Sequence, residues 1–130
     1  MRIIHLAVEL SENDRSDLDN IHQLGEGWVA EETLGIALYC SLKYREDFSA
    51  GVIAAVNHRG DSDSTGAVTG NILGALLGFH AIEDKWTDDL ELYDVLLEMA
   101  EDLCHGCPLS ASGSFRDPAW ETKYVHMHRA

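Results

Sequence analysis

The sequence contains few basic residues and few prolines. Lysine and arginine number 9 against 23 aspartates and glutamates, so the formal net charge is −14. A surface with this balance repels phosphate backbones and anionic membranes, and the sequence therefore predicts neither nucleic-acid nor membrane binding. Only 2 prolines occur and 45% of the residues are hydrophobic, which argues against a disordered chain. With 130 residues, we expect a single domain over residues 1–130 that buries a hydrophobic core.

The chain also lacks the features of a secreted protein. Its first residues, MRIIHLAVELSE, have too short an apolar stretch for a signal peptide and no small-residue cleavage site. The cysteines are odd in number: Cys40, Cys104 and Cys107. Together these features predict reduced thiols and a cytoplasmic protein.

The segment LCHGCP allows two interpretations. Cys104, His105 and Cys107 resemble part of a zinc site, but a second pair of ligands at zinc spacing is absent from the sequence. The alternative is the end of a helix, with Gly106 at the C-cap and Pro108 following it.

The sequence lacks strand-like alternation of any length, whereas helical spacing recurs throughout, so we predict an all-α fold, a compact helical bundle. Residues 1–10 could form a helix turn or a terminal strand. Helices are predicted over residues 28–43, 47–56, 64–82 and 117–124, and one more begins after an N-cap at Thr87. The expected buried face of that helix is Leu90, Tyr93, Leu97, Ala100 and Cys104, and its expected solvated face is Glu91, Asp94, Glu98, Glu101 and Asp102.

Glycines mark the predicted central helix at four-residue intervals: Gly66, Gly70, Gly74 and Gly78. Each internal glycine costs about 1 kcal/mol of helix stability relative to alanine. The stripe therefore predicts a close approach by neighbouring helices. A membrane span is the alternative, since small residues at this spacing also mediate contacts between transmembrane helices. The uncharged run is barely the ~20 residues that a span requires, and acids flank it, so a soluble bundle is favoured.

Acids and hydroxyls run from Asp61 to Thr65 immediately before this helix. Capping of the helix N-terminus accounts for such oxygens. Two neighbouring aspartates also repel each other, and a divalent cation would relieve that repulsion. An EF-hand calcium loop is excluded because its twelfth position, which must be glutamate, is Ile72. Hard oxygen ligands favour magnesium, manganese or calcium over zinc, and both the cap and the metal site stay open at this point.

Two segments resemble the ADP-ribosylglycohydrolase family. GDSDSTGAVTGNILGALLG resembles the C-terminal metal motif of that family, and GEGWVAEETLGIALYC resembles its substrate-side loop and following helix. With WTDDLELYDVLLEMAEDL after them, the resemblance covers roughly residues 24–103 in family order. It implies an all-α fold in which this chain corresponds to the C-terminal half.

The resemblance also implies a site. In the family, two metal ions, usually magnesium and in some members manganese, contact the hydroxyls of the distal ribose, and water then releases the ADP-ribosyl group. The implied metal ligands are Asp61, Asp63 and Ser64, and the implied substrate-binding residues are Gly25, Glu26, Gly27 and Trp28. A glycine turn and a core tryptophan would explain the second set equally well. The sequence assigns no catalytic residue.

The chain departs from the family in what it lacks. Family members are longer, and their N-terminal half supplies further metal ligands in a Thr-Asp-Asp motif. Thr87, Asp88 and Asp89 imitate that motif but follow the glycine helix, so they are not assigned as ligands. We expect a divalent-metal-dependent hydrolase of ADP-ribosyl glycosidic linkages that needs a complementary N-terminal half.

Two alternatives lie outside catalysis. One is a shortened, non-catalytic relative that binds ADP-ribose or a protein partner, and the other is a helical interaction domain whose acids only cap helices. Because a shortened chain exposes apolar surface, we also expect a homo-oligomer or a complex with a complementary chain.

Overall fold

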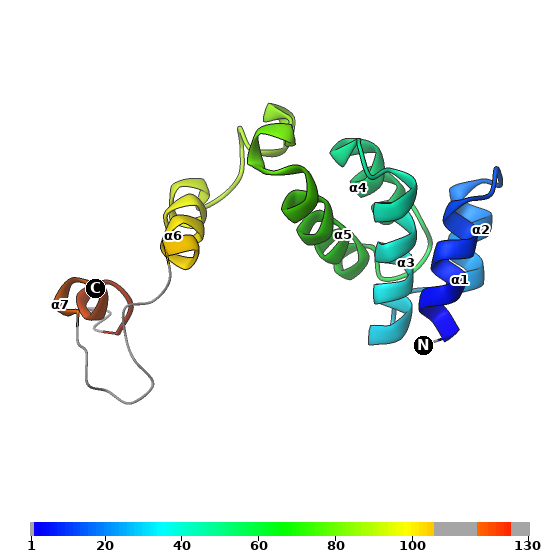
Figure 1. The fold of residues 1–130 in the computed structure, drawn as a ribbon, viewed down its shortest axis with the longest axis horizontal. Helices are drawn as coiled ribbons and strands as arrows, with labels where there is room; N and C mark the ends of the chain where they lie inside the picture. Colours follow the sequence, from blue (N-terminus) through cyan, green and yellow to red (C-terminus); the bar gives the residue numbers. More distant parts are fainter. Residues whose placement is uncertain (1, 106–116, 126–130) are drawn as a thin grey trace. The chain divides into compact units, whose positions relative to one another are not determined.

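The computed structural model describes residues 2–105 and 117–125, and these residues form helices and turns without a β-strand (Figure 1). The all-α prediction is confirmed. The α-helices are α1 (Arg2–Ser11), α2 (Asp17–Leu24), α3 (Ala30–Lys43), α4 (Phe48–Val56), α5 (Ser62–Leu77), α6 (Tyr93–His105) and α7 (Pro118–Trp120). Short 3-10 turns form η1 (Phe79–Ala81) and η2 (Asp84–Trp86), and a π-helical turn forms η3 (Glu121–Val125). Contacts divide the chain into two compact units, residues 1–89 and residues 90–130, and the single domain remains a prediction.

Helix α3 is the centre of the first unit, because α1, α2, α4 and α5 all pack against it. Its side chains Ile36, Tyr39 and Cys40 are fully buried. The residues that pack around them from the other helices are Ala7, Leu10, Ile21, Leu24, Ala54 and Ala55. Burial on several sides follows from the sequence of α3, whose apolar residues cover more than one face. Truncating Ile36 to alanine would cost about 2–5 kcal/mol of stability.

A polar cluster joins α2 to the C-terminal end of α3. The Asp17 carboxylate accepts hydrogen bonds from the Tyr39 hydroxyl at 2.6 Å, from Lys43 Nζ at 2.8 Å and from the Tyr44 hydroxyl at 2.7 Å. Buried Asn20 donates to the Tyr39 hydroxyl at 3.1 Å. Burial alone would raise the pKa of Asp17, but the hydrogen bonds from Lys43, Tyr39 and Tyr44 outweigh it and lower that pKa. The charged carboxylate therefore stabilises the packing of α2 on α3.

Helix α5 begins and ends elsewhere than predicted. It starts at Ser62 rather than Ser64 and stops at Leu77 rather than Ile82. Gly78 has φ 82°, in the left-handed region, and its N–H donates to the carbonyl of Gly74. A glycine in this conformation ends a helix because it has no Cβ to strain. Gly78 is therefore a terminator and not the fourth member of an internal stripe.

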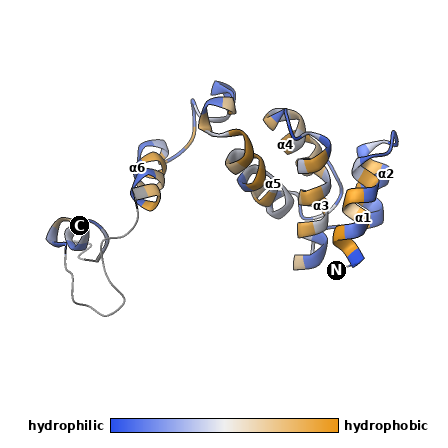
Figure 2. Cartoon of the chain, viewed as in Figure 1, coloured by the Kyte–Doolittle hydropathy of each residue, from blue (hydrophilic) through white to orange (hydrophobic). Residues whose placement is uncertain are grey.

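The predicted close approach along the glycine stripe holds at one position. A Cβ added to Gly66 would lie 2.5 Å from Val56 Cγ1, so α4 approaches α5 closely there. At Gly70 and Gly74 the prediction is wrong within the described residues, because no atom of a neighbouring helix lies within 4 Å of an added Cβ. Figure 2 colours the C-terminal part of α5 mainly hydrophobic, and Asp63 is the one charged residue of this helix. The stripe thus combines a packed first turn with an open remainder.

In the second unit, α6 begins at Tyr93, so the prediction of a helix capped by Thr87 is wrong. Thr87 instead ends η2, and its hydroxyl donates to the Asp84 carbonyl at 3.2 Å. Leu92 has φ 60°, which breaks helical geometry directly before Tyr93. The predicted buried face is also wrong for the described residues: Leu90, Ala100 and Cys104 are exposed, and Tyr93 and Leu97 are half-buried.

The predicted helical segment near the C-terminus is confirmed as α7 and η3, with Asp117 accepting from the backbone N–H groups of Ala119 and Trp120. Asp102 of α6 accepts a hydrogen bond from Lys123 at 2.6 Å and another from the Tyr124 hydroxyl, so the expected solvated face of α6 is partly covered. Gly106, Cys107 and Pro108 lie outside the described residues, so both the zinc and the helix-end interpretation of LCHGCP stay predictions. No described helix is long and apolar enough to cross a membrane.

Candidate functional site

Two segments that are distant in the sequence meet at the start of α5. The backbone N–H of Asp61 donates to the carbonyl of Glu26 at 2.7 Å. A Cβ added to Gly60 would overlap that same carbonyl oxygen, so only glycine permits the contact. The structure therefore places the loop of residues 25–28 directly against the start of the acidic segment.

The loop has a conformation that needs glycine and outside support. Gly25 has φ 123° and Gly27 has φ 83°, both in the left-handed region. Oε2 of Glu32, in the first turn of α3, accepts the N–H groups of Glu26 at 3.1 Å and Gly27 at 3.0 Å. The Thr33 hydroxyl donates to the Gly27 carbonyl at 2.8 Å. The start of α3 thus holds the loop through both its donors and its acceptors.

Trp28 lies at the surface beside this loop. Its side chain is 67% exposed, so the core-tryptophan alternative is wrong. The indole N–H donates to Glu26 Oε2 at 3.2 Å, which ties the ring to the loop. An exposed indole fixed by its polar edge offers a flat apolar surface to a ligand.

The acidic segment occupies the first turn of α5. Asp61 is the N-cap residue, yet its side chain makes no capping hydrogen bond, and its carbonyl accepts the N–H of Thr65 at 3.2 Å. Asp63 is exposed and accepts the N–H of Ser64 at 3.0 Å, while Asp61 and Ser64 are half-buried. Capping therefore does not account for the Asp61 carboxyl.

The Asp63 carboxyl responds to its surroundings. The Asp61 carboxyl, together with the backbone N–H groups of Ser64 and of Asp63 itself, holds the pKa of Asp63 below its usual value. Asp63 is therefore ionised at neutral pH beside a second carboxyl group, an arrangement that a divalent cation would stabilise.

A histidine and a threonine fix the turn that leads into α5. The N–H of Gly60 donates to His58 Nδ1 at 3.1 Å, so the neutral imidazole carries its proton on Nε2. That nitrogen lies 2.9 Å from Thr65 Oγ1, which donates in turn to the Ala55 carbonyl at 2.7 Å. The sequence alone assigned no site role to His58, Thr65, Glu32 or Thr33, because their hydrogen bonds join turns and helices and follow no fixed spacing.

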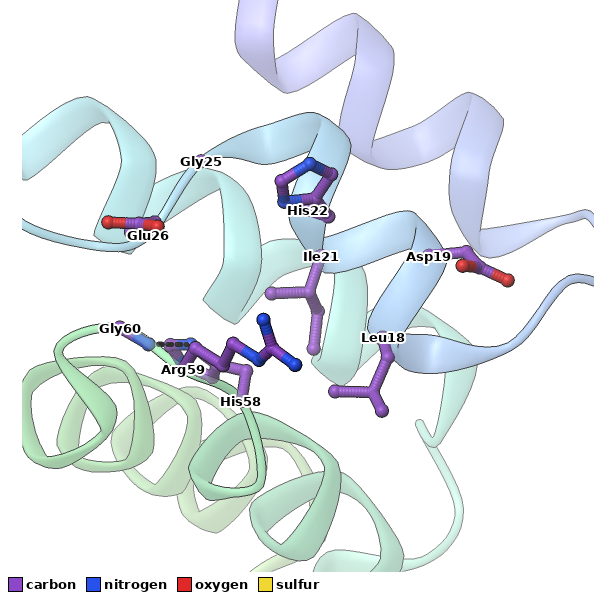
Figure 3. Close-up of a pocket in the computed structure, with 9 residues that line it drawn as sticks. All are labelled: Leu18, Asp19, Ile21, His22, Gly25, Glu26, His58, Arg59 and Gly60. Carbon is purple, nitrogen blue, oxygen red and sulfur yellow. Dashed lines mark hydrogen bonds between the residues drawn. The ribbon is translucent and has the colours of Figure 1, made fainter.

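A cavity of about 350 Å³ borders the same contact (Figure 3). Its lining residues come from α2, from the loop and from the turn before α5: Leu18, Asp19, Ile21, His22, Gly25, Glu26, His58, Arg59 and Gly60. Figure 3 shows the side chains of Ile21 and Arg59 directed toward the same space. Gly25 and Glu26 of the loop therefore line a cavity that also contains a cationic side chain, that of Arg59.

The donor set of the acidic segment suits magnesium in part. Asp61, Asp63 and Ser64 supply carboxylate and hydroxyl oxygens, which hard cations prefer. Magnesium commonly binds through one or two carboxylates and keeps several waters. Among residues 2–105 and 117–125, no group of three or more His, Cys, Asp or Glu side chains is placed to hold a metal ion. The described residues thus fit a portion of one magnesium shell and do not supply a second.

Comparisons with known proteins point in one direction. The family described as ADP-ribosylglycohydrolase matches residues 2–112. The ADP-ribosylarginine hydrolase Tri1 of Serratia proteamaculans is 35% identical over 63 residues, which cover 48% of this chain and 17% of that protein. An uncharacterized protein of Archaeoglobus fulgidus is 36% identical over 94 residues, covering 70% of this chain and 30% of the relative. No solved structure matches.

The match to each of these relatives spans less than a third of that relative's length. The family match nevertheless extends over most of this chain and includes both segments that meet at Glu26 and Asp61. The chain belongs to the ADP-ribosylglycohydrolase family.

Proposed function

We propose that the loop of residues 25–28 and the start of α5 form part of a divalent-metal-dependent site for the hydrolysis of ADP-ribosyl glycosidic linkages. The observation that carries the proposal is the 2.7 Å hydrogen bond from Asp61 N–H to the Glu26 carbonyl. It joins the proposed substrate loop to the proposed metal ligands in a chain of this family. A relative named as an ADP-ribosylarginine hydrolase makes ADP-ribosylated arginine the first substrate to test.

Each group of residues takes a separate role in this proposal. Asp61, Asp63 and Ser64 would hold Mg²⁺, or Mn²⁺ in its place. A divalent ion bound there supplies a fixed positive charge that orients ribose hydroxyls and polarises water at neutral pH. Trp28 offers its exposed ring to the substrate, and the loop backbone at Gly25–Gly27, which packs against Glu32 and Thr65, holds the substrate-binding loop beside the start of α5.

The remaining ligands come from elsewhere. The described residues provide no third acidic or histidine ligand next to Asp61 and Asp63, so water, substrate hydroxyls and a complementary chain complete the site. An assembly with such a chain, or a homo-oligomer, is therefore part of the proposal. Light scattering of the purified chain at micromolar concentration tests it, and a strictly monomeric species would count against self-assembly.

Isothermal titration with ADP-ribose, with and without Mg²⁺, tests the site itself. The wild type and Asp63→Ala are compared with Asp14→Ala, which removes one exposed acid from the turn between α1 and α2. We expect binding that needs Mg²⁺, is lost in Asp63→Ala and is retained in Asp14→Ala. Equal behaviour of all three proteins, with or without the metal, would refute the proposed site.

Release of ADP-ribose from an ADP-ribosylated arginine peptide then separates an enzyme from a binder. The hydrolase proposal expects Mg²⁺-dependent release that Asp63→Ala abolishes. Binding without release, also in the presence of Mn²⁺, would favour the alternative of a non-catalytic ADP-ribose-binding module.

A further inference from the structure

We propose that Glu32 is a positioning residue of the candidate site, which sets the place of the metal ligands through the loop of residues 25–28. The inference rests on the proposed function, because it assigns Glu32 a part in organising that site. Glu32 itself contacts neither Asp61 nor Asp63 in the hydrogen bonds of the structure. It acts through Glu26, whose backbone it binds on one side and whose carbonyl accepts from Asp61 on the other.

Glu32 binds the backbone of the loop directly. One carboxylate oxygen, Oε2, accepts the N–H groups of Glu26 at 3.1 Å and Gly27 at 3.0 Å. A Cβ added to Gly25 would overlap the Glu32 side chain, so the carboxylate also packs against the loop backbone. Hydrogen bonds to an ionised acceptor are roughly twice as strong as those between neutral groups.

The loop in turn contacts the start of α5. The carbonyl of Glu26 accepts the N–H of Asp61 at 2.7 Å, and a Cβ added to Gly27 would lie 3.0 Å from Thr65 Cγ2. The loop backbone is therefore the hydrogen-bond acceptor for the N-cap of α5, and a loop that moves away removes that acceptor. Because Asp61 is that N-cap, its carboxyl moves with the turn.

Ordinary helix capping does not explain this arrangement. Glu32 is the third residue of α3, where a glutamate usually reaches back to the N–H of the N-cap residue, here Val29. Its carboxylate instead binds Glu26 and Gly27, which precede the cap. The side chain thus serves the loop and not the helix start.

A matched pair of substitutions isolates the acceptor. Glu32→Gln keeps the length and one acceptor oxygen, whereas Glu32→Met keeps the length and removes both oxygens. Glutamate, glutamine and methionine have similar helix propensities, so α3 is preserved in both variants. Glu31→Gln and Glu31→Met are the controls, because Glu31 is the preceding, exposed residue of the same turn.

Amide hydrogen exchange followed by NMR tests the positioning without any ligand. In Glu32→Met we expect exchange at Glu26, Gly27 and Asp61 to accelerate by roughly tenfold or more, while exchange at the core residue Tyr39 is unchanged. Glu32→Gln should stay within about threefold of the wild type, since one acceptor remains. Unchanged exchange at Asp61 in Glu32→Met would overturn the inference, whether or not the loop amides respond.

Titration of the same proteins with ADP-ribose and Mg²⁺ gives the functional consequence. Removing a group that orients metal ligands typically lowers metal affinity by about 10- to 100-fold, and we expect a loss of this order in Glu32→Met with partial rescue in Glu32→Gln. Wild-type affinity in Glu32→Met would overturn the inference and leave the proposed function standing. If the wild type does not bind ADP-ribose, the proposed function is refuted. The rate of amide hydrogen exchange at Asp61 in Glu32→Met then decides by itself whether Glu32 positions this turn.

Discussion

A carboxylate joins each end of α3 to a neighbouring segment, but the two carboxylates bind different partners. At the C-terminal end, Asp17 of α2 accepts from three side chains of α3 and the residue after it, Tyr39, Lys43 and Tyr44. At the N-terminal end, Glu32 of α3 accepts from two backbone N–H groups of a loop with left-handed glycines. The first arrangement fixes one helix against another. The second binds a loop whose glycines have left-handed backbone angles, and the carbonyl of Glu26 in that loop accepts the N–H of the candidate metal ligand Asp61.

The largest loss of stability among the variants that probe the two ends of α3 is expected for Gly60→Ala, which removes the contact between the loop and α5. The added Cβ would overlap the backbone carbonyl of Glu26, so one of the two segments must move. We expect a loss of about 3 kcal/mol in the free energy of unfolding, at the upper end of overpacking effects, and loss of any Mg²⁺-dependent ADP-ribose binding. Urea denaturation measures the first quantity. Wild-type stability of this variant would show that the described contact is not formed.

The next effect is expected at the opposite end of α3. Asp17→Ala leaves the donors Tyr39, Lys43 and Tyr44 without their common acceptor. We expect the free energy of unfolding to fall by about 2 kcal/mol, a value kept low because the Asp17–Lys43 ion pair is partly exposed to solvent. ADP-ribose binding per folded molecule should not change, since this cluster does not touch the loop. Weaker ADP-ribose binding by fully folded Asp17→Ala would contradict the view that the cluster at the C-terminal end of α3 acts independently of the site at its N-terminal end.

Acid should weaken the same cluster. The hydrogen bonds lower the pKa of Asp17 in the folded state below its unfolded value of about 3.8. The carboxylate therefore contributes stability that is fully present above the unfolded pKa and is lost as pH falls through the folded pKa. The stability difference between the wild type and Asp17→Asn should shrink over that acidic range, as thermal unfolding at a series of pH values would reveal. A difference that stays constant with pH would exclude this role for the charge of Asp17.

A smaller and opposite effect is expected for Gly70→Ala. No described atom of a neighbouring helix lies within 4 Å of the added Cβ, and alanine favours a helix interior over glycine by about 1 kcal/mol. The variant should therefore raise the midpoint of thermal unfolding. A lower midpoint would indicate that another surface, such as a second copy or a complementary chain, covers this part of α5 in solution.

The smallest effect on stability is expected for Trp28→Ala. The ring is mostly exposed, so the free energy of unfolding should change by no more than about 0.5 kcal/mol. Binding of ADP-ribose should weaken, because the proposed contact surface is lost. A large decrease in the free energy of unfolding would show that Trp28 contributes mainly to folding and not to ligand binding.

Local patterns were sufficient to predict part of the fold. Asp47 caps α4 one residue before Phe48, which agrees with a helix predicted over residues 47–56. The end of α5 was missed because a glycine at four-residue spacing can be either a packing position or a left-handed terminator, and only the backbone angle of Gly78 distinguishes them. Thr87 was assigned to the wrong helix because a hydroxyl can cap a 3-10 turn as well as begin a helix.

The candidate site was predicted through family resemblance more than through residue chemistry. Asp61, Asp63 and Ser64 lie together because they are adjacent in one turn, as the sequence already required. That the loop at Glu26 meets them depends on the packing of α3 against α5, which no local pattern specifies. The same holds for His58 and Glu32, whose partners were set by tertiary structure. Their assignment as site residues remains a prediction to be tested.

Paramagnetic broadening by Mn²⁺ tests the central claim most directly, because it locates the ion without requiring catalysis. NMR spectra of the amide groups are recorded while Mn²⁺ is added in the presence of ADP-ribose, with Asp63→Asn as the comparison. We expect the signals of both Glu26–Trp28 and Asp61–Thr65 to broaden first in the wild type, and neither segment to respond preferentially in Asp63→Asn. Broadening spread evenly over the acidic surface, or identical in the two proteins, would contradict a metal site built from these two segments.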